Sequence, residues 1–234
     1  MHRIASLPGE DPTEEITLVE QGQSPIRVLT SATTDIATLS SCLKLKSNEY
    51  LKDKFNALPL SALKHPSQID HYIYKCCNTT QLVIIRLIGD RSYWSYGLEQ
   101  FSIWQKKSLN RQLIVVSGTK EASLELSSLC SLNNEIVSFL EELLNIGGLN
   151  NFNTLLEILN KLISKSEILL DNYLIEKIPD PFPYNWILKK GKKIIILHYN
   201  SLLKSGDTEL ADEIEAEIIK LGFIPRTIWV STLT

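Results

Sequence analysis

Short, dense apolar runs recur along the chain and predict its β-strands. The densest run, LVII at residues 82–85, is typical of a strand that is buried on both faces of a parallel sheet. Further strands are predicted at residues 26–30, 112–116, 194–197 and 227–230. We expect residues 194–197 to form a fourth buried strand.

Between these runs, apolar residues recur at helical spacing. Ile36, Leu39 and Leu43 share one face of a helix that follows the first strand, and Asp35 lies in its first turn, near the positive end of the helix dipole. Further helices are predicted at residues 66–77, 93–107, 134–145, 152–162 and 208–220. Residues 48–63 are mixed in character, and we expect them to be only loosely helical.

The helix predicted at residues 208–220 has the clearest two-sided pattern. Leu210, Ile214, Ile218 and Leu221 line one face, which we expect to pack on a sheet, and acidic residues line the rest. Gly222 marks the end of this helix.

The alternation of strands and helices predicts an α/β fold with a parallel sheet and helices on its faces. We assign residues 1–130 to a Rossmann-like N-terminal head domain and residues 131–165 to a helical hairpin that connects it to the next domain. Residues 166–188 are a proline-rich linker, and residues 189–234 form an incomplete βαβ unit that begins a second α/β domain. Sheets usually carry more strands than one such unit supplies, which favours the interpretation that the chain is a fragment.

Composition and charge exclude several classes of protein. The chain has 234 residues, of which 44% are hydrophobic, enough for one or two cores. Its formal net charge of −3 does not indicate a nucleic-acid partner or an anionic membrane surface. No apolar run approaches the roughly 18 residues of a membrane span, and the N-terminus lacks a secretory signal. We therefore expect a cytoplasmic protein.

Motifs for metals and nucleotides are missing from the sequence. The four cysteines have no CxxC spacing, so a zinc site is not expected, and we expect reduced thiols. No GxxxxGK[ST] or GxGxxG motif occurs, so the chain has no ordinary ATP or dinucleotide cradle. The four histidines do not converge in the sequence. We predict no catalytic and no metal-ligating residue in this chain.

The turn after the strand at residues 82–85 leads into a cluster of aromatic and cationic side chains, namely Arg86, Arg91, Tyr93, Trp94 and Tyr96. In α/β sheets, ligands usually bind beside the carboxyl ends of strands. The three aromatic residues either begin a helix that packs on the sheet or form, with the arginines, a flat lip for a planar or anionic ligand. The residues alone leave both interpretations open.

Several stretches carry a resemblance to a known family. The most specific is RLIGDRSYWSYGLE at residues 86–99, supported by MHRIA at the N-terminus, VLTSA at residues 28–32 and the segment at residues 199–208. Taken in their order along the chain, these stretches resemble the N-terminal part of the cobaltochelatase large subunit (CobN type), a relative of the magnesium chelatase large subunit. Members of that family are far longer, so the chain resembles an N-terminal fragment or a separately encoded first portion.

The resemblance implies a role in cobalamin biosynthesis. Cobaltochelatase is a ligase that forms nitrogen–metal bonds by ATP-dependent insertion of Co²⁺ into a corrin precursor of the hydrogenobyrinic acid a,c-diamide type. The expected partners are an AAA+ ATPase subunit with its integrin-like partner subunit, the tetrapyrrole substrate and the remainder of the large subunit. Cobalt and ATP serve the whole complex, and we expect this chain alone to bind neither. The chelation site is expected outside this chain, which is therefore expected to be inactive alone.

The resemblance also indicates a second candidate ligand site between residues 199 and 208. This segment runs from a strand end to a helix N-terminus, where free backbone N–H groups favour an anion. Three positions match the family pattern: Ser201, Gly206 and Thr208. Asn200 and Leu202 depart from it, since family members commonly carry Arg and His there. The alternative is that Asp207 or Thr208 only caps the helix.

Other functions remain open at the level of sequence. The chain is alternatively a non-enzymatic module that binds a tetrapyrrole or a partner, an inactive truncated product, or a fragment of a magnesium chelatase large subunit. Titration of the protein with a metal-free tetrapyrrole distinguishes these functions, because a chain that binds no tetrapyrrole, in any partner's presence, counts against a chelatase role. The coding DNA beyond Thr234 tests the truncation hypothesis.

Overall fold

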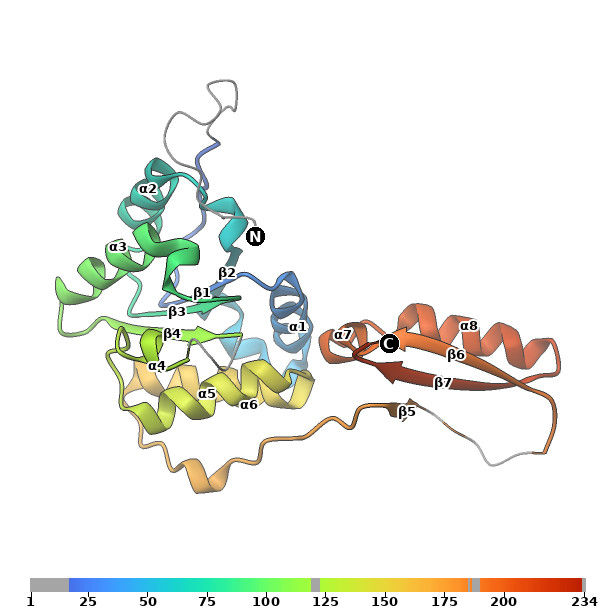
Figure 1. The fold of residues 1–234 in the computed structure, drawn as a ribbon. Helices are drawn as coiled ribbons and strands as arrows, with labels where there is room; N and C mark the ends of the chain where they lie inside the picture. The colour runs from blue at the N-terminus through green and yellow to red at the C-terminus, as the bar shows by residue number, and fades with distance from the viewer. Residues whose placement is uncertain (1–16, 119–122, 185, 187–189, 233–234) are drawn as a thin grey trace.

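The computed structural model describes residues 17–118, 123–184, 186 and 190–232 of the chain (Figure 1). It is an α/β fold with two separate sheets. The first sheet and its helices form the N-terminal unit, and the second sheet lies to one side of that unit (Figure 1). The predicted fold class is confirmed.

The first sheet is parallel and has the strand order β2-β1-β3-β4. Its strands are β1 (Ile26–Thr30), β2 (Phe55–Pro59), β3 (Leu82–Leu87) and β4 (Gln112–Ser117). The predicted strands β1, β3 and β4 are confirmed, whereas β2 was missed. The stretch expected to be loosely helical contains two 3₁₀ helices, η1 (Lys46–Lys54) and η2 (Leu60–Ala62), and departs from that expectation only at β2 between them. The proline that ends β2 is tolerated because β2 is an edge strand.

Helices cover both faces of the first sheet (Figure 1). On one face lie α1 (Thr33–Lys44), α5 (Asn134–Ile146) and α6 (Leu149–Ser164). On the other face lie α2 (Pro66–Cys76) and α3 (Ser95–Lys106), and the short α4 (Ser123–Ser127) follows β4. Alternate residues of β3 belong to the two different cores, since Ile84 packs with the first group of helices and Ile85 with the second. This arrangement explains the continuous apolar run at residues 82–85.

The predicted helical hairpin is an integral layer of the N-terminal unit. Leu155, Leu156 and Leu159 of α6 are fully buried in the same core as β1 and α1. Gly147 ends α5 with a positive φ of 73°, as the double glycine predicts. We expected this hairpin to connect two sheet domains. Its apolar residues instead pack against the first sheet and are buried there.

The second sheet has the strand order β5-β7-β6. Its strands are β5 (Phe182–Tyr184), β6 (Lys193–Tyr199) and β7 (Ile224–Val230), and its helices are α7 (Asn200–Ser205) and α8 (Glu209–Lys220). β6 and β7 are parallel, and β5 is antiparallel to β7. The end of the predicted proline-rich linker therefore contributes a strand, with Pro183 on the sheet edge, where a missing N–H is tolerated. The 3₁₀ helix η5 (Leu170–Asn172) lies earlier in the same segment.

Two predictions about burial in this second unit were wrong. Exposure alternates along β6, so only one of its faces is covered, although a strand buried on both faces was expected. The face of α8 that packs on the sheet carries Ala211 and Ile218, whereas Leu210 is 64% exposed and Leu221 is 71% exposed. With only three strands beneath it, α8 buries a narrower stripe than the full apolar pattern of its sequence.

The two units meet where α7 packs against α1 (Figure 1). The Thr38 hydroxyl of α1 donates to the Lys204 carbonyl of α7 at 3.5 Å. Gly206 follows α7 with a φ of 75°, and a Cβ on it would lie 2.9 Å from the Leu149 side chain. The close approach of α7 to the start of α6 therefore depends on this glycine.

Candidate functional site

The first candidate site lies at the carboxyl edge of the first sheet. The chain passes from β1 to β2 on one side and then crosses to β3 on the other side of β1. The carboxyl ends of β1 and β3 are therefore the topological switch point of the sheet, where α/β folds usually bind ligands. Ser31 follows β1 at this point, and its backbone N–H donates to the Arg86 carbonyl of β3 at 2.9 Å.

A buried ion pair holds the two strand ends to the helices on one face. Arg86 Nη1 donates to Asp35 Oδ1 of α1 at 2.6 Å, and Arg86 Nη2 donates to Asn145 Oδ1 of α5 at 3.2 Å. The second carboxylate oxygen, Asp35 Oδ2, accepts from the Thr30 hydroxyl at 2.6 Å. The Arg86 and Asp35 side chains are 13% and 5% exposed. The guanidinium is thus neutralised and fixed in place.

Two buried donors at this edge have no hydrogen-bond partner among the described residues: Arg86 Nε and Ser31 Oγ. Unpaired buried polar atoms are unfavourable and rare, so two on neighbouring strand ends mark unmet hydrogen-bonding capacity. Both can donate to an acceptor such as a carboxylate or amide oxygen. Both atoms are buried, so an acceptor that bonds them must lie within this edge of the sheet.

A second cation, Lys204 of α7, lies near this site. Burial lowers the pKa of the Lys204 ammonium below its usual value, the Asp180 carboxylate raises it, and the Arg86 guanidinium lowers it. The influence of Arg86 places the Lys204 ammonium within electrostatic range of the carboxyl edge of the first sheet.

The predicted aromatic and cationic lip is divided between the two faces of the sheet. Arg86 faces α1 and α5, whereas Tyr93, Trp94 and Tyr96 pack with the core on the other face. Trp94 is fully buried, its Nε1 donates to the Leu63 carbonyl at 3.0 Å, and its ring lies 5.9 Å from the Phe101 ring. Trp94 therefore serves packing and presents no surface to a ligand.

The remaining members of that cluster are separate from Arg86. Arg91 is exposed at the start of the 3₁₀ helix η3 (Arg91–Trp94). The Tyr96 hydroxyl donates to the Asp70 carboxylate of α2, with oxygen distances of 3.0 and 2.9 Å. Partial burial and this carboxylate raise the pKa of Tyr96. The structure therefore brings Tyr96 to α2 and leaves Arg91 at the surface.

The second candidate segment, residues 199–208, is mostly the short helix α7. Ser201 is exposed on α7, and Gly206 ends that helix. The Thr208 hydroxyl donates to Asp212 Oδ2 at 3.0 Å, and neither Thr208 nor Asp207 makes the predicted side-chain cap with the backbone of α8. The three residues that match the family pattern thus lie along one connection without a shared hydrogen-bond partner among the described residues.

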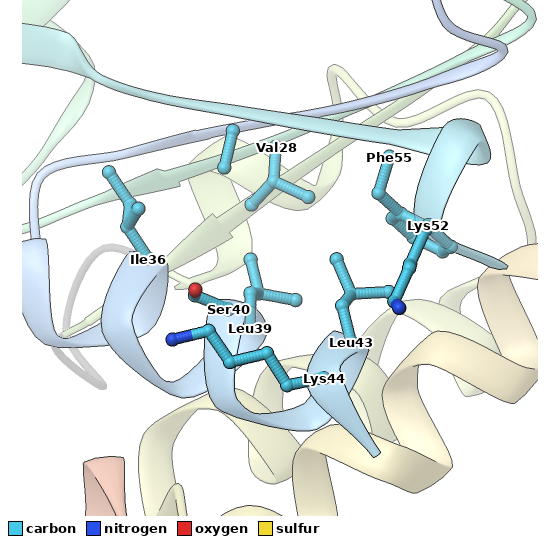
Figure 2. Close-up of a pocket in the computed structure, with 9 residues that line it drawn as sticks. Val28, Ile36, Leu39, Ser40, Leu43, Lys44, Lys52 and Phe55 are labelled. Atoms are coloured by element: carbon cyan, nitrogen blue, oxygen red, sulfur yellow. The ribbon is translucent and has the colours of Figure 1, made fainter. Parts of the chain in front are cut away.

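A groove that the sequence did not predict lies between α1 and β2 (Figure 2). It has a volume of about 360 Å³, within the range of roughly 300–1,000 Å³ for small-molecule pockets. Its lining is apolar apart from a serine and two lysines, and consists of Val28, Ile36, Leu39, Ser40, Leu43, Lys44, Lys52, Phe55 and Ala57. It was missed because it is formed by β2, an edge strand that the sequence pattern did not reveal.

Other site residues were missed for a related reason. Asp35 was noted for its charge in the first turn of a helix, near the positive end of the dipole, and nothing in the sequence links it to Arg86, 51 positions away. Asn145 and Lys204 reach the edge only because α5 and α7 pack there. The one available signal was the position of Ser31 and Arg86 at the ends of predicted strands.

Metal and membrane features were sought in the same part of the chain. Among the described residues, no group of three or more His, Cys, Asp or Glu side chains lies close enough to hold a metal ion. In that same part of the chain, no helix combines the length and apolar character needed to cross a bilayer.

Comparison with known proteins supports the resemblance seen in the sequence. No family model matches the chain. Over 153 residues it is 28% identical to the aerobic cobaltochelatase subunit CobN of Pseudomonas aeruginosa, a match that covers 64% of this chain and 12% of that protein. The chain thus resembles part of a CobN-type subunit and spans a small fraction of the relative's length.

The structure is similar to that of the catalytic subunit of cobaltochelatase from Mycobacterium tuberculosis. The TM-score is 0.69 at 17% sequence identity, and the similarity covers 92% of this chain and 16% of the other. At this identity the similarity shows a shared fold. It extends along nearly the whole chain and therefore includes both sheets.

Proposed function

We propose that this chain is the opening α/β portion of a cobaltochelatase-type large subunit. The subunit inserts Co²⁺ into a corrin-precursor tetrapyrrole, and ATP hydrolysis by a partner AAA+ subunit with its integrin-like companion drives the insertion. The observation that carries the proposal is the fold shared with a cobaltochelatase catalytic subunit along 92% of the chain. The sequence identity with CobN points to the same family.

In this proposal the chain binds and positions, and the metal-inserting groups lie elsewhere in the large subunit. Insertion requires groups that desolvate the metal and accept protons from ring nitrogens. The carboxyl edge of the first sheet instead carries two buried donors without a partner among the described residues, Ser31 Oγ and Arg86 Nε. Such donors suit the carboxylate and amide side chains that surround a corrin precursor. The chain would then form one wall of the tetrapyrrole site.

A chimera tests this function. The matching region of Pseudomonas aeruginosa CobN is replaced by this chain, and cobalt insertion is measured with the ATPase subunits, ATP and a metal-free corrin precursor. We expect insertion to be retained. Arg86→Met combined with Asp35→Asn, which removes the guanidinium without leaving a buried unpaired carboxylate, should weaken tetrapyrrole binding by a folded chimera about tenfold. An Arg91→Met exchange at the exposed position is the matched control and should leave binding unchanged.

The same chimera separates the alternatives. A folded chimera that binds the tetrapyrrole without inserting cobalt would favour a binding module. Insertion of Mg²⁺ into a porphyrin, with no activity on the corrin precursor, would favour the magnesium chelatase alternative. A folded chimera that neither binds nor inserts would refute the proposal.

A further inference from the structure

Within the part of the chain that the structure describes, one face of β6 in the second sheet carries exposed side chains. On this face, which we call the β6 face, Ile195 is 67% exposed, Leu197 is 53% exposed and Tyr199 is 54% exposed. The opposite face packs against α8, where the Tyr184 hydroxyl donates to Asp212 of that helix and the Tyr184 ring packs on Trp229. Three large side chains in a row on one strand therefore face outward.

The neighbouring part of β7 is better covered. Register places Arg226 and Ile228 beside Ile195 and Leu197 on the same face. Arg226 is buried, and its guanidinium lies 5.5 Å from the centre of the Trp186 ring. The most exposed part of this face is thus β6, since Ile228 is partly buried and Arg226 is buried.

The free edge of β6 lies beside this uncovered face. Among the strands of the described residues, β6 is outermost and pairs only with β7, in parallel, so within that part of the chain its other edge carries unpaired backbone groups. Proteins usually blunt such edges with charges, prolines or bulges, yet residues 194–197 are IIIL. A continuous apolar run of this kind is typical of a parallel strand with a neighbour on each side and a helix layer on each face.

We propose that the β6 face and the free edge of β6 are a docking surface for a strand–helix segment from the remainder of the large subunit. The strand would pair in parallel with β6, and its helix would cover Ile195, Leu197 and Tyr199. This inference rests on the proposed function, since it takes the partner to be chelatase-type polypeptide.

The relatives and the charges support this choice of partner. The solved relative shares the fold of 92% of this chain within 16% of its own length, so it carries abundant further polypeptide. Parallel sheets grow by strand–helix units, which supply both the missing strand and the missing cover. Lys190, Lys192 and Lys193 are exposed around the start of β6. The docking strand should therefore carry acidic residues at the end that pairs there.

The test uses the purified 234-residue chain and, as the probe, Pseudomonas aeruginosa CobN from which the matching region has been deleted. We expect the two to associate, and hydrogen exchange of the β6 amides to slow at least tenfold in the complex. A Leu197→Lys exchange should weaken association at least tenfold. It alters an exposed side chain, so circular dichroism should be unchanged. Leu109→Lys, at another exposed leucine, is the matched control and should bind as the unsubstituted chain does.

Several results would overturn the inference. These are an absence of association, equal binding by the Leu197→Lys variant, or β6 amides that are already as protected in the free chain as those of β3. Self-association of the free chain that is abolished by Leu197→Lys would assign the surface to a second copy instead. If the separate chain associates with the deleted CobN but the chimera inserts no metal, the proposed function alone is refuted. If a chimera with Leu197→Lys inserts metal fully, this inference alone is refuted.

Discussion

At the scale of single residues, the carboxyl edge is organised by one ion pair. Arg86 and Asp35 come from a central strand and from the helix that follows the neighbouring strand. Both side chains are nearly buried, and both are also held by uncharged partners, Asn145 and Thr30. Breaking a buried pair leaves an uncompensated charge, whereas replacing both partners is much less costly.

We therefore predict strong coupling between these two positions. Arg86→Met should lower the free energy of unfolding by about 3 kcal/mol, because it leaves the Asp35 carboxylate buried without its cation. Asp35→Asn combined with Arg86→Met should recover at least about 1 kcal/mol of that loss. Urea unfolding of the two single variants and the double variant measures the coupling. Purely additive effects would contradict the prediction.

The buried thiols give a prediction that depends on pH. Burial raises the pKa of Cys42 to about 12, and that of Cys77 to about 12. The unfolded thiol ionises near its ordinary pKa of 9.0, so above that pH the unfolded state binds fewer protons than the folded state. The stability contributed by the neutral thiol is therefore fully present below pH 9 and is lost as the pH rises from 9 toward 12.

The measurement compares the unsubstituted chain with Cys42→Ala across this range. We expect the stability difference between the two proteins to shrink as the pH rises from 8 to about 10.5. The native thiols should also react slowly with a thiol reagent at pH 8 and rapidly after unfolding in urea. A stability difference that is constant with pH would refute the explanation.

At the scale of elements, α8 shows how tertiary context selects the buried stripe of a helix. Ala211, Glu215 and Ile218 face the sheet, while Leu210 and Leu221 point to solvent. Hydrophobic spacing alone identified the helix but not which part of its broad apolar surface would be covered.

This orientation predicts unequal effects of two similar substitutions. Ile218→Ala should lower the free energy of unfolding by about 2 kcal/mol, since it removes buried methylene groups. Leu210→Ala on the same helix should change it by less than about 0.5 kcal/mol. Thermal unfolding of both variants is the check, and equal losses would mean that α8 packs with the face expected from its sequence.

The strands and helices that were predicted correctly share a strong, local signal. The apolar run at β3 and the leucine stripe of α6 are long enough to specify both element type and burial. β2 was missed because a five-residue edge strand that ends in proline has no clear period. Of the residues at the carboxyl edge of the first sheet, only Arg86 was a predicted ligand-binding residue, because it follows the apolar run of β3; Ser31 was not predicted. The partners Asp35, Asn145 and Lys204 depend on packing over long sequence separations and could not be predicted.

At the scale of the whole molecule, a four-stranded sheet and a three-stranded sheet are joined by a long connecting segment and by the packing of α7 on α1. Residues of the segment after α6, among them Ile168 and Tyr173, pack against the core of the N-terminal unit. β5 at the end of this segment then joins the second sheet. The N-terminal unit has helices on both faces of its sheet, whereas the second sheet is covered on one face over β6. Among the described residues, the first sheet is thus covered on both faces, whereas the second leaves Ile195, Leu197 and Tyr199 exposed.

The position of α7 has a consequence for how displacements pass between the two units. α7 begins where β6 ends and packs against α1, which begins just beyond the end of β1. The carboxyl ends of both sheets therefore open toward one junction, with Arg86 on one side and Lys204 on the other. Any displacement of α7 relative to α1 would therefore be felt at the carboxyl ends of both sheets at once, since the Thr38 hydroxyl of α1 is bonded to the Lys204 carbonyl of α7.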